Sequence, residues 1–354
     1  MTLLRKFHKL LSFNMSLRGD SDLSTLPNGI YCLNYHRVGD MNETMFDANV
    51  FSCTEEALNN HIGYLKEHFT IISLDALLQM IEKPGTTQGK YLVITFDDGY
   101  IDNYTKAFPI LKSHGVTASF FVATDYISSS KIPWWDSVAY IINSLHDNSS
   151  IKLASLSSKT FKLYNNKKNV IREILRIFKE KSEYSIDEKL AILKRDTGID
   201  YDKINSGNLF MTWDMLKEMS DDGMDIGSHT CSHQLLSHLD SNEQTNELTR
   251  SKKIIERHIG KQVIALAYPV GAFNSYNLDS SLIAKLSGYK LAFDFEKGIN
   301  TFPLKDRAFE LHRFPVNYEH DNKAIITMFF NVNTKTNDLQ YNSSFWWNTH
   351  KKGK

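Results

Sequence analysis

Short apolar runs rich in β-branched and aromatic residues recur along the chain, and segments with helical periodicity separate most of them. Runs of this kind are typical of strands buried on both faces, as in parallel sheets. The predicted strands are 29–36, 91–96, 116–123, 224–229, 263–268, 289–295 and 311–316. The predicted helices are 54–67, 74–82, 103–113, 213–222, 241–259 and 278–287. Seven strands with intervening helices favour an incomplete α/β barrel, and an open doubly wound sheet is the alternative.

The stretch between the third and fourth predicted strands, about 128–210, is too long for a simple connection between a strand and a helix. Helical patterns within it predict an inserted helical subdomain. The pattern elsewhere predicts an amphipathic N-terminal segment (1–28), a barrel domain built from 29–127 and 211–333, and a polar C-terminal tail (334–354).

Charge changes this picture in one place. The chain has 41 Lys and Arg against 41 Asp and Glu, so no global field favours nucleic acid as a partner. Residues 152–195, however, carry 12 Lys and Arg against 5 Asp and Glu. This excess predicts contact with an anionic part of the substrate or with an anionic membrane surface, and a solvated helical face is the alternative.

Cysteine content and the N-terminal sequence indicate the cellular compartment in which the protein is expected. Three scattered cysteines are too few for a disulfide framework and fit a reducing compartment. Residues 1–20 contain no long apolar run of the kind that marks a secretory signal. We therefore expect a cytoplasmic protein. The leucines near the N-terminus recur at helical spacing, so a helix docked on its own domain and a helix at the inner face of the membrane are both open.

The first candidate for chemistry is Asp97-Asp98-Gly99, where an apolar strand ends. Two adjacent buried carboxylates are costly unless a cation or hydrogen bonds compensate them. One carboxylate could bind a metal ion while the other acts as a base. A surface turn is the alternative for this tripeptide alone.

The second candidate is His229 and His233, which follow another predicted strand. In a helical segment this spacing turns both imidazoles the same way, so that both can reach one ion. Together with a carboxylate they would leave coordination positions open for water, as a catalytic site with a divalent transition metal requires. A chance pair on the surface is the alternative.

These two motifs together resemble the polysaccharide deacetylase family (NodB homology, the family-four carbohydrate esterases). Ala267–Gly271 resembles the third motif of the family, and Leu311–Arg313 falls where the last motif is expected. The resemblance implies a distorted (β/α)7 barrel and a metal that is typically zinc. It also implies that Asp97 is the general base and that the metal ligands are Asp98, His229 and His233.

The third motif implies a wall of the substrate site and an oxyanion donor. The implied wall consists of Tyr268, Pro269, Val270 and Gly271, with the backbone N–H of Val270 as the donor. Trp213 is a further candidate to line the substrate cleft, and core packing is the alternative for it.

One residue departs from the pattern of the family, and one catalytic role has two candidates. Many members carry an arginine where Ala267 stands, and we expect Arg313 to orient Asp97 instead. The general acid is either His36, in a Tyr-His pair after the first strand, or His312. Neighbours in a strand point to opposite faces, so we expect only one of His312 and Arg313 to reach the site.

The resemblance implies hydrolysis of an N-acetyl group on an amino sugar or glycan precursor in surface-polysaccharide biosynthesis. An O-acetyl esterase acting on a glycan would use the same residues. A catalytically inactive glycan-binding barrel is the third alternative.

Overall fold

The computed structural model describes residues 23–83, 88–200 and 209–332. Most of the predicted N-terminal segment (1–28) and all of the predicted tail (334–354) lie outside the described residues. None of the described helices is long and apolar enough to cross a membrane.

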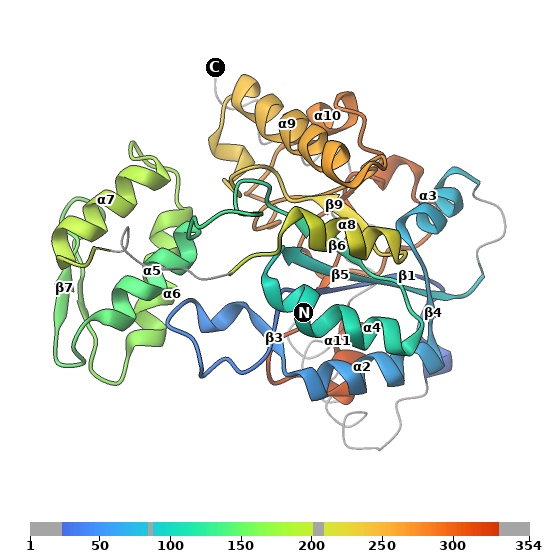
Figure 1. The fold of residues 1–354 in the computed structure, drawn as a ribbon, viewed down its shortest axis with the longest axis horizontal. Helices are drawn as coiled ribbons and strands as arrows, with labels where there is room; N and C mark the ends of the chain where they lie inside the picture. The colour runs from blue at the N-terminus through green and yellow to red at the C-terminus, as the bar shows by residue number, and fades with distance from the viewer. Residues whose placement is uncertain (1–22, 84–87, 201–208, 333–354) are drawn as a thin grey trace, which may run out of the picture.

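A curled parallel sheet forms the centre of the fold (Figure 1). Its strand order is β11-β10-β9-β6-β5-β1-β12, and the short β4 pairs with β5 beside this path. The strands are β1 (Gly29–Tyr35), β4 (Thr70–Ile71), β5 (Lys90–Asp98), β6 (Ser119–Val122), β9 (Asp225–Ser228), β10 (Ala265–Ala267), β11 (Leu291–Phe293) and β12 (Phe314–Pro315). The seven predicted strands all occur, and the prediction of a parallel α/β fold is confirmed.

The segment that leads into β12 brings the two edges of the sheet together. Its Leu311 N–H donates to the carbonyl of Ala292 in β11, and the Asp294 N–H donates to the carbonyl of Leu311. Three residues after Leu311, Phe314 pairs with Leu33 of β1. The sheet therefore curls as a distorted barrel does, rather than lying open.

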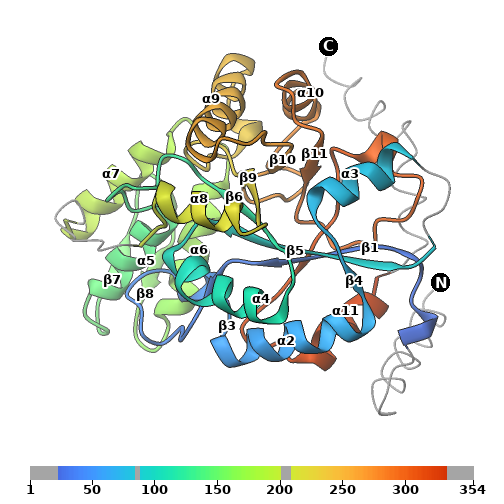
Figure 2. The ribbon, with the colours of Figure 1, turned by 45° about the vertical axis from the view of Figure 1, so that its right-hand side comes forward.

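Two groups of helices cover the sheet (Figures 1 and 2). One group consists of α2 (Glu55–His68), α4 (Phe108–His114) and α11 (Asn322–Phe330), and a π-helical turn, η3 (Asn103–Ala107), precedes α4. The other consists of α8 (Trp213–Asp221), α9 (Ser241–Ile259) and α10 (Leu278–Leu286), while α3 (Leu74–Glu82) lies beside β4. All six predicted helices occur, and side chains cap many of them. Asp240, for example, accepts hydrogen bonds from the first turn of α9.

Between β6 and α8 the chain forms a separate group of elements, drawn in green at the left of Figure 1. These are α5 (Trp134–Ser144), β7 (Ser150–Lys152), β8 (Thr160–Lys162), α6 (Lys167–Lys179) and α7 (Ile186–Thr197), called here the α5–α7 segment. The sequence pattern predicted helices here but not the antiparallel pair β7–β8. Shorter elements elsewhere are β2 (Arg37–Val38), β3 (Phe51–Cys53), η1 (Leu23–Thr25), η2 (Ala48–Val50), η4 (Leu236–His238) and η5 (Lys305–Arg307).

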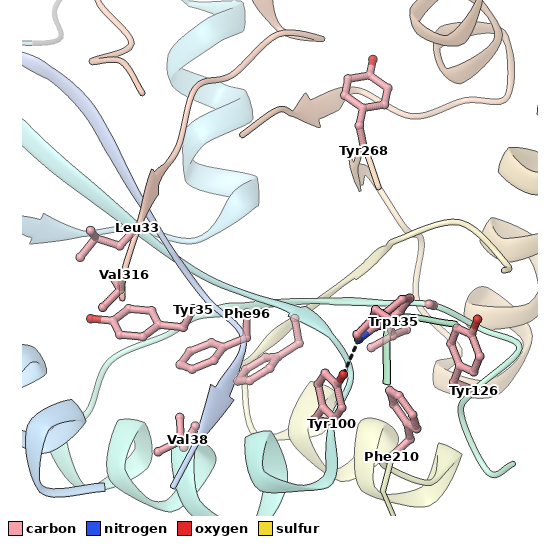
Figure 3. Packing of buried hydrophobic residues seen from close by; sticks show 14 of the residues in the cluster. Leu33, Tyr35, Val38, Phe96, Tyr100, Tyr126, Trp135, Phe210, Tyr268 and Val316 are labelled. Atoms are coloured by element: carbon pink, nitrogen blue, oxygen red, sulfur yellow. Dashed lines mark hydrogen bonds between the residues drawn. The ribbon is translucent and has the colours of Figure 1, made fainter. Parts of the chain in front are cut away.

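A buried aromatic network joins the α5–α7 segment to the end of β5 (Figure 3). The Trp135 Nε1–H donates to the Tyr100 hydroxyl at 2.7 Å, and that hydroxyl donates to Asp136 at 2.8 Å. The second oxygen of Asp136 accepts the N–H of Asp47 at 2.9 Å. Burial raises the pKa of Asp136 to about 7. These bonds fix α5 directly beside the residues that follow β5.

Candidate active site and metal centre

The candidate residues meet because the strands are parallel. Side chains that follow the carboxyl ends of parallel strands gather at one edge of the sheet. Asp97 and Asp98 end β5, His229 follows β9, and His36 follows β1. Three runs that are far apart in the sequence thus contribute to one site.

Left-handed backbone conformations turn the site residues inward. Asp98 has φ 75° and His233 has φ 56°, a region that non-glycine residues seldom occupy. Gly99 follows at φ 91°, and a Cβ atom there would lie 2.9 Å from Ile127 Cδ1. The segment from His229 to His233 is a loop rather than a helical turn, because Thr230 (φ 65°) and His233 have left-handed backbone conformations. Unusual φ angles held by surrounding structure are typical of functional sites.

Asp98, His229 and His233 lie together in a buried cluster. Their potential ligand atoms are all within 4.8 Å of one another. The Nε2 atoms of His229 and His233 lie 3.6 Å and 3.5 Å from Asp98 Oδ1. These separations suit three ligands of one ion at about 2.0–2.2 Å from each ligand.

The hydrogen bonding around the cluster fits a cation. The His229 Nδ1–H donates to the carbonyl of Ala267 at 2.7 Å, which leaves the lone pair on Nε2. Within the described chain, Asp98 Oδ1 is buried without a hydrogen-bond partner. Burial, followed by the charge of Asp97, raises the pKa of Asp98 well above its ordinary value. A divalent cation would compensate this carboxylate and could bind the Nε2 atoms of His229 and His233 that face it.

Asp97 is held by Arg313 in a bidentate ion pair. Arg313 Nη1 and Nη2 donate to the two carboxylate oxygens at 2.7 Å and 2.9 Å. Asn34 donates to Asp97 Oδ2 at 3.1 Å. Burial alone would raise the pKa of Asp97, but the charge of Arg313, and next that of His229, hold it below its ordinary value. Asp97 therefore stays ionised and fixed in orientation, with no direct contribution from Ala267.

The two candidates for the general acid lie in different surroundings. His36 lines the same cavity as Asp97. Burial lowers the pKa of its imidazole to about 4. The His312 ring instead interacts with Asp294 at 2.9 Å through Nδ1 and with Arg307 at 2.9 Å through Nε2. Arg313, the neighbour of His312, is the one that reaches Asp97.

The predicted wall of the substrate site lies partly on the cavity. Tyr268 and Val270 line it, and the Tyr268 ring stacks on Tyr276 at 4.1 Å. Val270 has φ 62°, and among the described residues no hydrogen bond uses its N–H. Gly271 permits close packing, since a Cβ atom there would lie 2.7 Å from Phe295 Cβ. Pro269 joins Tyr268 to Val270 and is absent from the cavity lining.

Trp213 is not brought to the site. It opens α8, and its ring stacks on His258 of α9 at 4.3 Å. The cavity lining does not include it. The contact with His258 matches the alternative of packing between helices.

The cavity has a volume of about 250 Å³, and residues of the α5–α7 segment also line it. Trp134 and Trp135 enter from α5, and Leu175 and Lys179 enter from α6. The Trp135 ring packs against the His233 imidazole with centroids 4.4 Å apart. The α5–α7 segment therefore forms one wall of the candidate site.

Glu247 of α9 is a further residue that sequence reasoning missed. Its Oε2 accepts the backbone N–H groups of Cys231 and Ser232 at 2.8 Å and 2.9 Å, and its Oε1 accepts the Ser232 hydroxyl at 2.8 Å. These bonds hold the loop between the two histidines. No local motif marks this glutamate, which lies in a helical pattern of ordinary composition.

Comparisons with known proteins agree with this arrangement. Residues 84–292 match the family model described as polysaccharide deacetylase. The Bacillus subtilis (strain 168) protein YxkH, described provisionally as a polysaccharide deacetylase, is 23% identical over 272 residues. That match covers 77% of this chain and 66% of YxkH, slightly less than two thirds of its length.

Two solved structures show the same fold. The Streptococcus pyogenes deacetylase PplD in complex with acetate aligns with TM-score 0.56 and 20% identity, covering 86% of this chain and 99% of that one. The de-N-acetylase from Aggregatibacter actinomycetemcomitans aligns with TM-score 0.54 and 20% identity, covering 84% and 99%.

Proposed function

The chain belongs to the polysaccharide deacetylase family, and from this premise we propose that it is a metal-dependent hydrolase that removes an N-acetyl group from an amino sugar. The substrate is a glycan or glycan precursor of surface-polysaccharide biosynthesis. The observation that carries the proposal is the cluster of Asp98, His229 and His233 beside an ionised Asp97. The structurally similar Aggregatibacter protein is a de-N-acetylase, which favours the amide over an ester.

The residues of the cluster would hold one divalent transition metal ion, with zinc as the natural choice for two imidazoles and one carboxylate. Such an ion polarises a carbonyl and acidifies a water molecule. Asp97 accepts the proton of the attacking water, because its ion pair with Arg313 keeps it ionised and aimed. The N–H of Val270 donates to the oxygen that becomes negatively charged.

His36 is the proposed general acid, since it lines the cavity that contains Asp97. Its lowered pKa makes it neutral at pH 7. It must therefore receive a proton during turnover before it donates one to the leaving nitrogen. His36 can receive the proton that Asp97 removes from water. The overall reaction then consumes one water and releases acetate and a free amine.

The test is acetate release from matched substrates. Purified protein is incubated with N-acetylglucosamine oligomers and with an O-acetylated glycan, with and without added Zn²⁺, and an Asp98→Asn variant serves as the control. The proposal expects acetate from the N-acetylated substrate that depends on both the ion and Asp98. Release from the O-acetylated glycan alone would favour an esterase, and release from neither would favour a binding protein.

A further inference from the structure

Lys179 is the last residue of α6, and it lines the catalytic cavity together with Asp97, Asp98 and both histidines. It comes from the α5–α7 segment rather than from a strand end. Leu175, one helical turn earlier, lines the same cavity and places this face of α6 against the site.

Other basic residues of residues 152–195 serve the segment itself. Lys167 Nζ donates to the carbonyls of Asn143 and Leu145 at the end of α5, at 3.2 Å and 2.6 Å. The buried Lys189 Nζ donates to three carbonyls at the end of α6, the shortest at 2.7 Å. Lysines near a helix C-terminus stabilise its unpaired carbonyls in this way.

Lys179 has no comparable role in the part of the chain that the structure describes. No carboxylate oxygen there lies within 4.0 Å of its Nζ. The carboxylates that face it are Asp47 and Asp98. Asp98 belongs to the metal cluster, and the Asp47 Oδ1 atom accepts the N–H and side-chain amide of Asn49. Lys179 is an exposed residue that lines the cavity, so its ammonium is accessible to a ligand.

A lysine ammonium that lines a cavity and has no carboxylate within ion-pair distance can form a charge-assisted hydrogen bond with an anionic group of a ligand. The acidic groups of the cavity already have other roles. Asp97 pairs with Arg313, Asp98 belongs to the metal cluster, and Asp47 caps η2. We propose that Lys179 binds an anionic group, a phosphate or a carboxylate, on the N-acetylated substrate. This inference rests on the proposed function and adds the substrate class to it.

The experiment compares three probes that differ in charge: N-acetylglucosamine 1-phosphate, N-acetylmuramic acid and neutral di-N-acetylchitobiose. Steady-state acetate release is measured for the wild type, Lys179→Gln and Lys179→Arg. Lys168→Gln is the matched control, because Lys168 is exposed on the same helix and is absent from the cavity lining. Thermal unfolding of each variant reports on folding.

A charge-assisted hydrogen bond is worth enough that its loss raises KM at least about 10-fold. We expect this rise in Lys179→Gln for one or both anionic probes, with kcat retained and Lys179→Arg near wild type. The probe that responds distinguishes a phosphate from a carboxylate. The neutral probe and Lys168→Gln should change less than about twofold.

An equal rise in KM for the neutral probe, or no rise for either anionic probe, would overturn the inference. So would a loss of thermal stability in Lys179→Gln that Lys179→Arg restores without any change in KM. If the wild type releases acetate from none of the probes or oligomers, the proposed function fails instead.

Discussion

Removal of the Arg313 side chain should destabilise the protein far more than an ordinary substitution. Arg313 is 1% exposed and donates to Asp97, Asn34, Thr95 and the carbonyl of Asp294. In Arg313→Met, the ionised Asp97 would remain buried without its counter-ion. Breaking a buried pair from one side typically costs about 3–5 kcal/mol in the free energy of unfolding.

The double variant Arg313→Met, Asp97→Asn distinguishes the effect of breaking the ion pair on stability from the effect of lost packing. It removes both charges, so it should be more stable than Arg313→Met alone although it carries one more substitution. Arg313→Lys should fall between wild type and Arg313→Met, because a lysine keeps the charge but loses the bidentate geometry. Urea unfolding of the four proteins with chelator present measures these differences without a contribution from bound metal.

A loss below about 1 kcal/mol in Arg313→Met would refute this reasoning, since that is the range of exposed ion pairs. A double variant no more stable than Arg313→Met would also refute it. The metal content of Arg313→Met offers an independent check. It should stay near that of wild type, because Arg313 contacts Asp97 and none of the proposed ligands.

Further predictions follow from the same contacts. Asp97→Asn should retain bound metal, measured by elemental analysis, while acetate release falls about 10²–10⁴-fold, the range for a general base. His36→Gln should lower kcat with little change in unfolding, whereas His312→Gln should cost about 1–3 kcal/mol of stability, because it disrupts a buried hydrogen bond to Asp294. Burial raises the pKa of Asp225 from its ordinary 3.8 to about 6, so the folded protein binds more protons than the unfolded chain between these values. Stability should therefore fall as pH rises through this window, and thermal unfolding of Asp225→Asn should show a flatter dependence on pH.

The strands were predictable because a parallel sheet buries both faces of each strand. β1, for example, is buried at every position, and its sequence is an apolar run interrupted only by Asn34. Helix α5 escaped prediction for a related reason. Eight of its 11 residues are buried, so no polar face marks a helical period.

Only part of the candidate site carries a local signal. Asp97 and Asp98 are adjacent, and His229 and His233 are close in sequence, so each pair forms a recognisable motif. Asn34 reaches Asp97 from 63 residues away, and Glu247 holds the histidine loop from a distant helix. Their contributions depend on tertiary packing.

Lys179 and Trp213 illustrate the limits of sequence reasoning in opposite directions. Lys179 is one of many lysines in a basic stretch, and only the packing of α6 brings it to the cavity. Trp213 resembles a residue that lines a cleft, yet it stacks on His258.

Titration of the metal-stripped protein with Zn²⁺, with acetate release from a panel of N-acetylated amino sugars as the readout, tests the central claim most directly. Activity should be absent at first, rise until one equivalent has been added, and stay absent in a His229→Ala, His233→Ala variant. Full acetate release before any metal is added, or from the double histidine variant, would contradict the account.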